Sequence, residues 1–293
     1  MRILSRLLIA AAIVGTGLIA PRPALAGSRL AILVGAGDIA SCGGHNDDAT
    51  AAVLARQGGT VFTAGDNVYD KGSYREFLDC YAPNWGRFKN RTAPAPGNHD
   101  YDTPGGAGYY RYFGARAGTA GKGWYAYNRA TWRIYVLNSN CDAVGGCFMG
   151  SPQQRWLAGD LAAHPHRCVL AYWHHPRFSS GQHGNDTDVA GFWITLYRAG
   201  AEAVINGHDH DYERFAKQNY QGERRPYHGI REFVVGTGGA GLRAFGPRLR
   251  NSLVSRADTY GVLKLVLRPG RYSWQFLPAA GGTFTDSGRG KCH

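Results

Sequence analysis

The sequence predicts an α/β fold in which mixed β-sheets are covered by helices. Short apolar or β-branched runs alternate with segments of helical periodicity through the early chain. The end of the chain is rich in strand patterns, and Tyr272-Ser-Trp-Gln-Phe alternates like a half-buried strand. Charged residues, at 18%, are too few for a coiled coil, and 44% hydrophobic residues are too many for a disordered chain. These three observations favour sheets packed against helices.

The individual elements follow from apolar runs, from helical periodicity and from the turn residues between them. The helix that starts after Ser151 has an N-cap residue followed by proline in its first turn. The predicted strands are Leu30–Val34, Thr60–Ala64, Thr92–Pro96, Trp132–Asn138, Cys168–Trp173, Ala203–Asn206, Glu232–Val235, Tyr260–Leu267 and Tyr272–Leu277. The predicted helices are Asp47–Arg56, Ser73–Cys80, Pro152–Ala163 and Val189–Ala199.

Residues 1–26 have the pattern of a secretory signal peptide. A positive start at Arg2 and Arg6 precedes an apolar run and a small-residue cleavage signal that ends at Ala26. The run is short for a bilayer span, so no membrane anchor is expected. We therefore expect a secreted or periplasmic protein whose residues 27–293 form a single domain. Removal of the leader, with its three arginines, lowers the formal net charge from +12 to +9.

The cysteines predict disulfides. Their number is even in a chain predicted to be exported, and none stands in a C-x-x-C pair that would suggest a zinc site. A disulfide between Cys141 and Cys147 would close a short loop. Cys42–Cys80 and Cys168–Cys292 are the pairs that we expect for the others, among the several connectivities that six cysteines allow. The six are Cys42, Cys80, Cys141, Cys147, Cys168 and Cys292.

Polar side chains of the metal-binding types follow five of the predicted strands, four times directly after a Gly. Because the carboxyl ends of strands in an α/β sheet face one crevice, these five loops can converge. Glycine allows the sharp turn that brings backbone close to an ion. The polar residues are Asp38, Asp66, Tyr69, Asn98, His99, His174, His175, His208 and His210.

This set of donors predicts a centre of two metal ions. Carboxylate and amide oxygens combined with imidazole suit Fe, Mn or Zn better than Ca. Two ions need a bridging carboxylate, and Asp66 stands in the middle of the set. Two ions about 3.5–4 Å apart can hold phosphate oxygens and an attacking hydroxide, which is the chemistry of phosphate-ester hydrolysis.

The order of these motifs resembles the calcineurin-like metallophosphoesterases and, within them, the purple acid phosphatases. The resemblance covers about residues 30–215 and implies a four-layer αββα sandwich with two mixed β-sheets flanked by helices. Many members have D-x-H in the first motif, whereas Ile39 and Ala40 follow Asp38 here. The motifs are Gly37-Asp38-Ile39-Ala40, Gly65-Asp66-Asn67-Val68-Tyr69, Gly97-Asn98-His99-Asp100, His174-His175-Pro176 and Gly207-His208-Asp209-His210.

The resemblance also implies which residues bind which ion. The first ion would take Asp38, Asp66, Tyr69 and His210, and the second would take Asp66, Asn98, His174 and His208. Tyr69 stands where purple acid phosphatases place a tyrosinate on Fe(III), which implies Fe(III) there and Fe, Zn or Mn at the second position. His174 is preferred to His175 because the family pattern is H-x-P.

The same resemblance implies two catalytic histidines. His99 would face the substrate phosphate, where it would stabilise charge or protonate the leaving group. His183 stands nine residues after His174, as does a substrate-facing histidine of purple acid phosphatases; a solvated loop histidine is the alternative.

The function expected is that of a secreted dinuclear-metal phosphatase that hydrolyses phosphate monoesters by attack of a metal-bound hydroxide. A phosphodiesterase or nucleotidase could use the same site, because metal ligands do not define the leaving group. A non-catalytic secreted protein that binds polyanions through its arginine-rich surface is a further alternative. The expected partner is a small phosphate ester, with no specific nucleic-acid partner and no membrane anchor.

Overall fold

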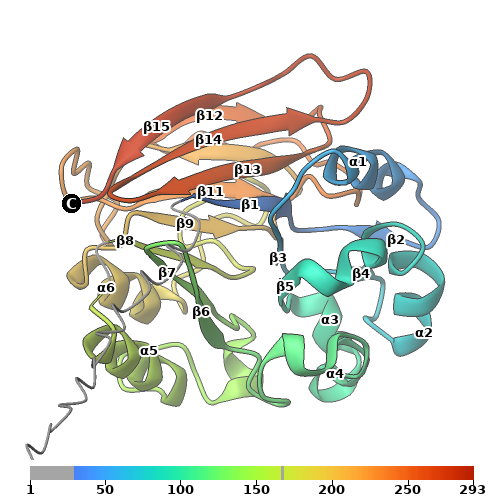
Figure 1. Cartoon of the computed structure of the whole chain (residues 1–293), viewed down its shortest axis with the longest axis horizontal. Helices are drawn as coiled ribbons and strands as arrows, with labels where there is room; N and C mark the ends of the chain where they lie inside the picture. Colours follow the sequence, from blue (N-terminus) through green and yellow to red (C-terminus); the bar gives the residue numbers. More distant parts are fainter. Residues whose placement is uncertain (1–29, 166–167) are drawn as a thin grey trace, which may run out of the picture.

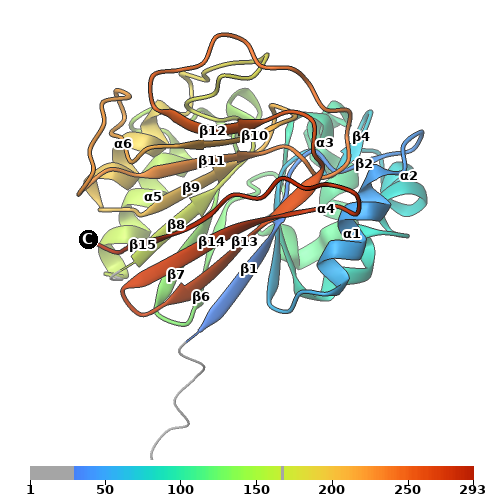
Figure 2. The ribbon, with the colours of Figure 1, turned by 90° about the horizontal axis from the view of Figure 1, so that it is seen from above.

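The computed structural model of the chain describes residues 30–165 and 168–293. Two large mixed sheets lie between helices, with α5 and α6 to one side and α1 to α4 to the other (Figure 1; Figure 2). The predicted α/β class with two mixed sheets flanked by helices is therefore confirmed.

The first sheet has six strands in the order β15-β14-β13-β1-β3-β5. Its neighbours β1, β3 and β5 run parallel, whereas β13 to β15 are antiparallel to their neighbours. The strands are β1 (Ala31–Ala36), β3 (Thr60–Ala64), β5 (Thr92–Ala95), β13 (Gly261–Arg268), β14 (Arg271–Pro278) and β15 (Ser287–Lys291).

The second sheet has seven strands in the order β12-β10-β11-β9-β8-β7-β6, and β7, β8, β9 and β11 run parallel. A two-stranded ribbon pairs β2 (Ala40–Ser41) with β4 (Val68–Tyr69). The seven strands are β6 (Tyr125–Arg129), β7 (Trp132–Val136), β8 (Cys168–Tyr172), β9 (Ala203–Asn206), β10 (Tyr212–Phe215), β11 (Arg231–Val235) and β12 (Ser252–Arg256).

The helices include short segments that the periodicity of the sequence did not predict. A π-helical turn, Phe77–Tyr81, follows α2, and several 3-10 turns connect the longer elements. The α-helices are α1 (Asn46–Ala55), α2 (Tyr74–Glu76), α3 (Asn98–Asp102), α4 (Ala107–Phe113), α5 (Pro152–Ala163) and α6 (Ala190–Arg198).

Strands β7, β8 and β9 of the seven-stranded sheet are buried on both faces, which explains their nearly continuous apolar sequences. Ile134 and Leu170 belong to the core between the two sheets. Their neighbours Tyr135 and Val169 point the other way and pack in a second core with α5 and α6. Successive side chains of a strand point to opposite faces of the sheet. Strands β7 and β8 therefore pack against the other sheet on one face and against α5 and α6 on the other.

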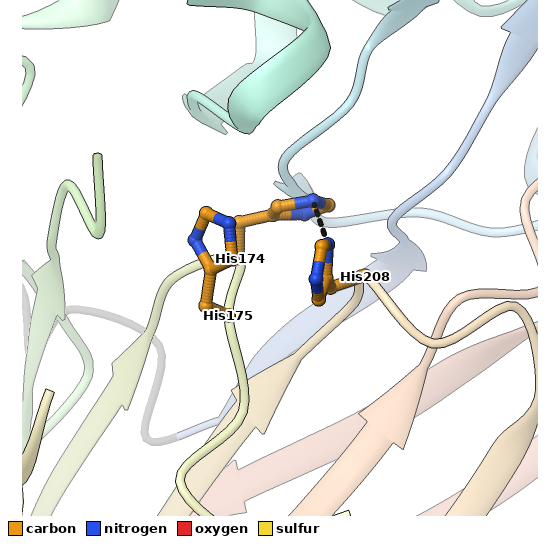
Figure 3. A group of neighbouring side chains, drawn as sticks. All are labelled: His174, His175 and His208. Carbon is orange, nitrogen blue, oxygen red and sulfur yellow. Dashed lines mark hydrogen bonds between the residues drawn. The ribbon is translucent and has the colours of Figure 1, made fainter. Parts of the chain in front are cut away.

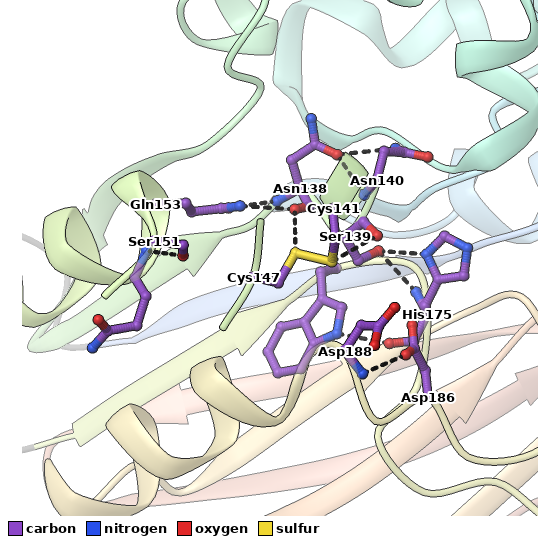
Figure 4. The surroundings of a disulfide bond; sticks show 12 residues. Asn138, Ser139, Asn140, Cys141, Cys147, Ser151, Gln153, His175, Asp186 and Asp188 are labelled. Carbon is purple, nitrogen blue, oxygen red and sulfur yellow. Dashed lines mark hydrogen bonds between the residues drawn. A yellow bond between two sulfur atoms is a disulfide. The ribbon is translucent and has the colours of Figure 1, made fainter. Parts of the chain in front are cut away.

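The three expected disulfides are confirmed. Cys42 is bonded to Cys80, Cys141 to Cys147, and Cys168 to Cys292. The second closes the short loop beside Ser139 (Figure 4), and the third ties the start of β8 to the segment after β15.

Most predicted strands and helices are confirmed within two residues, but some elements were missed. The predicted helix Ser73–Cys80 is wrong in its second half, where the π turn takes over. In that turn Phe77 and Tyr81 both pack against Tyr112 and Phe113. Strands β12 and β15 lie at sheet edges and have largely polar or glycine-rich sequences, so pairing rather than an apolar run makes them strands.

Among the described residues, no helix is both long enough and apolar enough to cross a bilayer. The predicted signal peptide, residues 1–26, lies outside the described residues.

A buried carboxylate connects the two sheets. Asp286, just before β15, accepts hydrogen bonds from Tyr212 (2.7 Å), from Arg214 (2.6 and 3.0 Å) and from the Trp274 indole (3.1 Å). Tyr212 and Arg214 belong to β10 of one sheet and Trp274 to β14 of the other. Burial opposes ionisation of Asp286, but Arg214 and Tyr212 outweigh it and lower its pKa below the ordinary value.

We predict that Asp286→Asn lowers the free energy of unfolding by about 2–4 kcal/mol, because Arg214 loses its buried counter-charge. Urea denaturation at neutral pH measures this change. Because the folded-state pKa of Asp286 is lowered, the stabilisation is present above the unfolded-state pKa, and the difference between the proteins should shrink as the pH falls below about 4.

The matched control is Asp258→Asn, which removes an exposed carboxylate 3.8 Å from Arg256. It should change the free energy of unfolding by less than about 1 kcal/mol. Equal losses in the two variants would contradict the assignment of Asp286 as the link between the sheets.

Candidate metal centre

The predicted polar residues meet at one end of the two sheets. Each stands at or just beyond the carboxyl end of a parallel strand, as the topology requires. The first sheet supplies those after β1, β3 and β5, and the second supplies those after β8 and β9. The seven candidate ligands are Asp38, Asp66, Tyr69, Asn98, His174, His208 and His210.

Three candidate ligands surround the hydroxyl of the fourth, Tyr69, which is almost fully buried. It lies 2.8 Å from Asp38 Oδ1, 3.0 Å from Asp66 Oδ2 and 3.1 Å from His210 Nε2. His210 Nε2 is also 3.4 Å from Asp38 Oδ1. These are the four residues that the sequence assigned to the first ion.

A second set surrounds His174 Nε2. It lies 3.0 Å from Asn98 Oδ1, 3.2 Å from His208 Nδ1 and 3.3 Å from Asp66 Oδ2. Figure 3 shows the facing rings of His174 and His208. These are the four residues assigned to the second ion, and Asp66 Oδ2 belongs to both sets.

The donor atoms of both sets fit metal ions because most of them present lone pairs to one another. Too few protons lie between these atoms for each close contact to be a hydrogen bond. His174 Nδ1 donates to the Ala64 carbonyl at 2.8 Å, and His210 Nδ1 donates to the Gly241 carbonyl at 2.6 Å. In the neutral rings, each Nε2 therefore carries a lone pair and faces a carboxylate oxygen. A carbonyl that accepts from the second ring nitrogen is the usual arrangement of a metal-binding histidine.

Backbone amides hold the carboxylate oxygens that point away from these sets. His99 N donates to Asp66 Oδ1 at 2.9 Å, and His208 N donates to Asp38 Oδ2 at 2.8 Å. Each carboxylate is thereby oriented with its other oxygen toward the cluster.

The backbone is strained at three of the candidate ligands. Asp38, Asp66 and His208 have φ angles of 59°, 47° and 72°. Ala130 is the remaining non-glycine residue with positive φ in the described part of the chain. Such conformations cost about 1–3 kcal/mol each and persist where the surrounding structure imposes them, which is common at functional sites.

Glycine is required where the loops touch. A Cβ on Gly97 would lie 2.1 Å from Asp66 Oδ1, and one on Gly207 would lie 2.5 Å from Asp38 Oδ2. The glycines next to the candidate ligands therefore permit close approach of neighbouring loops.

Without a cation, protons must stabilise this cluster. Burial lowers the pKa of His174, but Asp66 and Asp38 outweigh burial and raise it to about 9. Burial, together with the carboxylates of Asp38 and Asp66, raises the pKa of Tyr69 well above its ordinary value. A phenolate at Tyr69 therefore requires a cation that replaces the proton.

The two candidate catalytic histidines lie beside the cluster. The His99 ring is 4.4 Å from that of Tyr69, and its Nδ1 donates to the Asp70 carbonyl at 2.6 Å. The His183 ring lies 4.2 Å from that of His208. His183 Nε2 accepts a hydrogen bond from the guanidinium of Arg243, because a guanidinium can only donate.

Three further residues belong to the site. His175 contacts Ser139 at 2.7 Å (Figure 4), yet it also forms with His174 and His208 a group whose ring nitrogens could share an ion (Figure 3). Asp100 is fully buried and accepts from Gly97 N at 2.9 Å, which braces the turn before Asn98. Sequence reasoning missed Arg243, which belongs to none of the five motifs.

A family comparison agrees with this geometry. The model of the calcineurin-like phosphoesterase family matches residues 32–212, which include all seven candidate ligands. No curated protein matches the sequence significantly.

Solved structures share the fold at low sequence identity. Purple acid phosphatase PPD1 from seeds of yellow lupin (Lupinus luteus) has a TM-score of 0.71 and 18% identity over 91% of this chain. This chain covers 55% of the lupin protein, so it spans little more than half of that relative. GAP50, the anchor in the inner membrane complex of Plasmodium, has a TM-score of 0.63 and 14% identity over 90% of this chain and 88% of its own.

PhoD is a third similar structure, with a TM-score of 0.55 and 11% identity over 90% of this chain and 69% of its own. At these identities the likeness concerns the fold alone. The family match over most of the chain and the confirmed fold lead to one conclusion: the chain belongs to the calcineurin-like phosphoesterase family.

Proposed function

We propose that the protein is an exported phosphatase that binds two metal ions and hydrolyses phosphate monoesters, as purple acid phosphatases do. The observation that carries this proposal is the position of Asp66 Oδ2, which lies 3.0 Å from the Tyr69 hydroxyl and 3.3 Å from His174 Nε2. One carboxylate oxygen thus serves both donor sets, as a bridge between two ions requires. When bound, the two ions would activate water and offset the negative charge on phosphate oxygens.

The ligand sets proposed for the ions are those around Tyr69 and around His174. The first set, with two carboxylates and a phenol oxygen, favours a hard ion such as Fe(III). The second has one carboxylate, one amide and two imidazoles, and it suits Fe, Zn or Mn.

His99 is the proposed proton donor to the leaving group. Its Nδ1 is engaged by the Asp70 carbonyl and lies 3.4 Å from Asp102 Oδ2. Its Nε2 is 4.0 Å from Asp66 Oδ2. A protonated ring therefore keeps one proton at Nδ1 and presents the other at Nε2 to a leaving oxygen. His183 is the second proposed catalytic residue, facing the substrate from the side of His208.

Export is proposed from the leader pattern of residues 1–26 and is supported by three disulfides among the described residues. Residues 27–293 are proposed to be one domain, because residues of both sheets form the core between them.

Expression in a secreting host should yield a mature chain that starts at Gly27, as N-terminal sequencing will show. A retained Met1 on the exported protein would contradict the leader.

Substitution of the bridging carboxylate should remove both ions. We predict that Asp66→Ala holds close to no metal by elemental analysis and hydrolyses 4-nitrophenyl phosphate more than about 100-fold more slowly, since loss of even an outer partner of a ligand costs 10–100-fold. Asp258→Ala, at an exposed carboxylate, is the control and should retain metal and activity. Near-normal hydrolysis by Asp66→Ala would refute the proposed centre.

Removal of one hydroxyl tests the Fe(III)–tyrosinate assignment. Tyr69→Phe keeps the ring that packs on His99 and should abolish the visible absorption band of the iron-loaded protein. Tyr110→Phe, which removes a hydroxyl that is hydrogen-bonded to the hydroxyl of Tyr101, is the matched control and should leave the spectrum unchanged. A colourless wild-type protein that contains only zinc or manganese would contradict the iron assignment while leaving the phosphatase assignment intact.

A further inference from the structure

A pocket opens beside the first ligand set. It has a volume of about 430 Å³, and its lining includes Tyr69, His99, His210, Asp70 and Arg243. The pocket thus joins two proposed metal ligands and the proposed proton donor. Among the described residues that line it, only Arg243 brings a permanent positive charge.

The backbone fixes Arg243 relative to the metal centre. Arg243 N donates to the His210 carbonyl at 3.0 Å, and the carbonyl of Gly241 accepts from His210 Nδ1 at 2.6 Å. The segment 241–243 is therefore attached to both the backbone and the ring of a proposed ligand. A guanidinium on this segment has a defined place beside the site.

The charge of Arg243 has no anionic partner among the described residues. Its guanidinium contacts the neutral acceptor His183 Nε2 and forms no ion pair with a carboxylate. That contact uses one of the five donors of the guanidinium. The remaining donors and the whole charge are available to an anion in the pocket.

The form of this anion follows from what a guanidinium recognises. A phosphate monoester carries three strong acceptor oxygens and a charge of about −1.5 to −2 at neutral pH. In a diester, one of those oxygens bears a second substituent and one charge is lost. A diester keeps two non-bridging oxygens that share a single charge, so the planar fork of arginine pairs more strongly with the more highly charged phosphate of a monoester.

We propose that Arg243 binds the non-bridging oxygens of the substrate's phosphate and thereby selects phosphate monoesters over diesters. This inference rests on the proposed function and names the residue that decides its substrate class. His183 Nε2 accepts a hydrogen bond from this guanidinium, and the His183 ring lies 4.2 Å from that of His208. His183 therefore holds the guanidinium on the side next to His208.

A competing explanation is that Arg243 only positions His183. Loss of Arg243 would then slow the hydrolysis of monoesters and diesters by the same factor and would leave the affinity for phosphate unchanged. Specificity for monoesters instead requires a change in binding that depends on the number of free phosphate oxygens. The two explanations therefore differ in measurable ways.

The test compares wild type, Arg243→Gln, Arg243→Lys and Arg250→Gln, all as metal-loaded mature protein. Arg250→Gln is the matched control, because Arg250 is exposed in the same loop and does not line the pocket. Steady-state kinetics with 4-nitrophenyl phosphate and bis(4-nitrophenyl) phosphate separate KM from kcat. Calorimetry measures the Kd of inorganic phosphate, and elemental analysis verifies equal metal content.

For Arg243→Gln we expect KM for the monoester and Kd for phosphate to rise by about 10- to 100-fold, the range for a lost charged hydrogen bond. The kcat/KM for the diester should change by less than about threefold. Arg243→Lys, which keeps the charge but loses the fork, should recover part of the loss. Arg250→Gln should behave as wild type.

Unchanged monoester KM and phosphate Kd in Arg243→Gln, or equal losses for both esters, would overturn the inference. Failure of the proposed function is distinguishable from this result. In that case wild type binds its metal but does not hydrolyse the monoester, whereas the effect of Arg243→Gln on the phosphate Kd is still measured by calorimetry.

Discussion

The architecture of the site depends on one buried carboxylate, that of Asp66. Its Oδ2 lies within 3.3 Å of both the Tyr69 hydroxyl and His174 Nε2, while its Oδ1 accepts from the backbone of His99. An ionised carboxylate removed from water is very costly unless cations or donors surround it. The loops around Asp66 must therefore place hydrogen-bond donors or cation-binding groups beside its carboxylate. The conformation of the neighbouring backbone follows from this requirement.

The backbone and the hydrogen bonds around Asp66 hold its neighbouring groups in fixed positions. Left-handed backbone at Asp38, Asp66 and His208, together with glycine at Gly207, brings loops of two sheets into contact. Backbone carbonyls fix the imidazoles of His174 and His210 in the tautomer that leaves Nε2 toward the cluster. Preorganised ligands of this kind avoid reorganisation when an ion or a transition state must be stabilised. The link through Asp286 serves the same end at a distance, because it holds together the two sheets that contribute ligands.

For recognition of an anionic substrate, the position of a single arginine is more informative than the net charge of the chain. The formal charge of +12 is compatible with anionic substrates but identifies none. Arg243 contributes more specific information, because it lines the pocket beside Tyr69 and His99 with no carboxylate partner among the described residues. In the proposed function, the phosphate is bound by the two ions together with the guanidinium of Arg243. The segment that carries Arg243 is hydrogen-bonded to the candidate ligand His210.

The sequence by itself determined the α/β class, most strands and the family motifs. These features depend on local patterns: apolar runs such as Thr60–Ala64 form strands, and Gly-Asp or Gly-His pairs end them. The seven candidate ligands could be named for the same reason, since each stands in a short segment that follows a predicted strand. Their assignment to ions came from the resemblance, and the structure brings the same two sets together.

Only the tertiary structure decided the features that arise from contacts between distant segments. The edge strands β12 and β15 have weak patterns and become strands by pairing with neighbours. Asp286 meets Arg214 across 72 residues of sequence, and Arg243 meets His183 across 60. No periodicity or spacing encodes such pairs, because the side chains acquire their roles from the packing of one sheet on another and from the loop that carries Arg243 to the candidate metal centre.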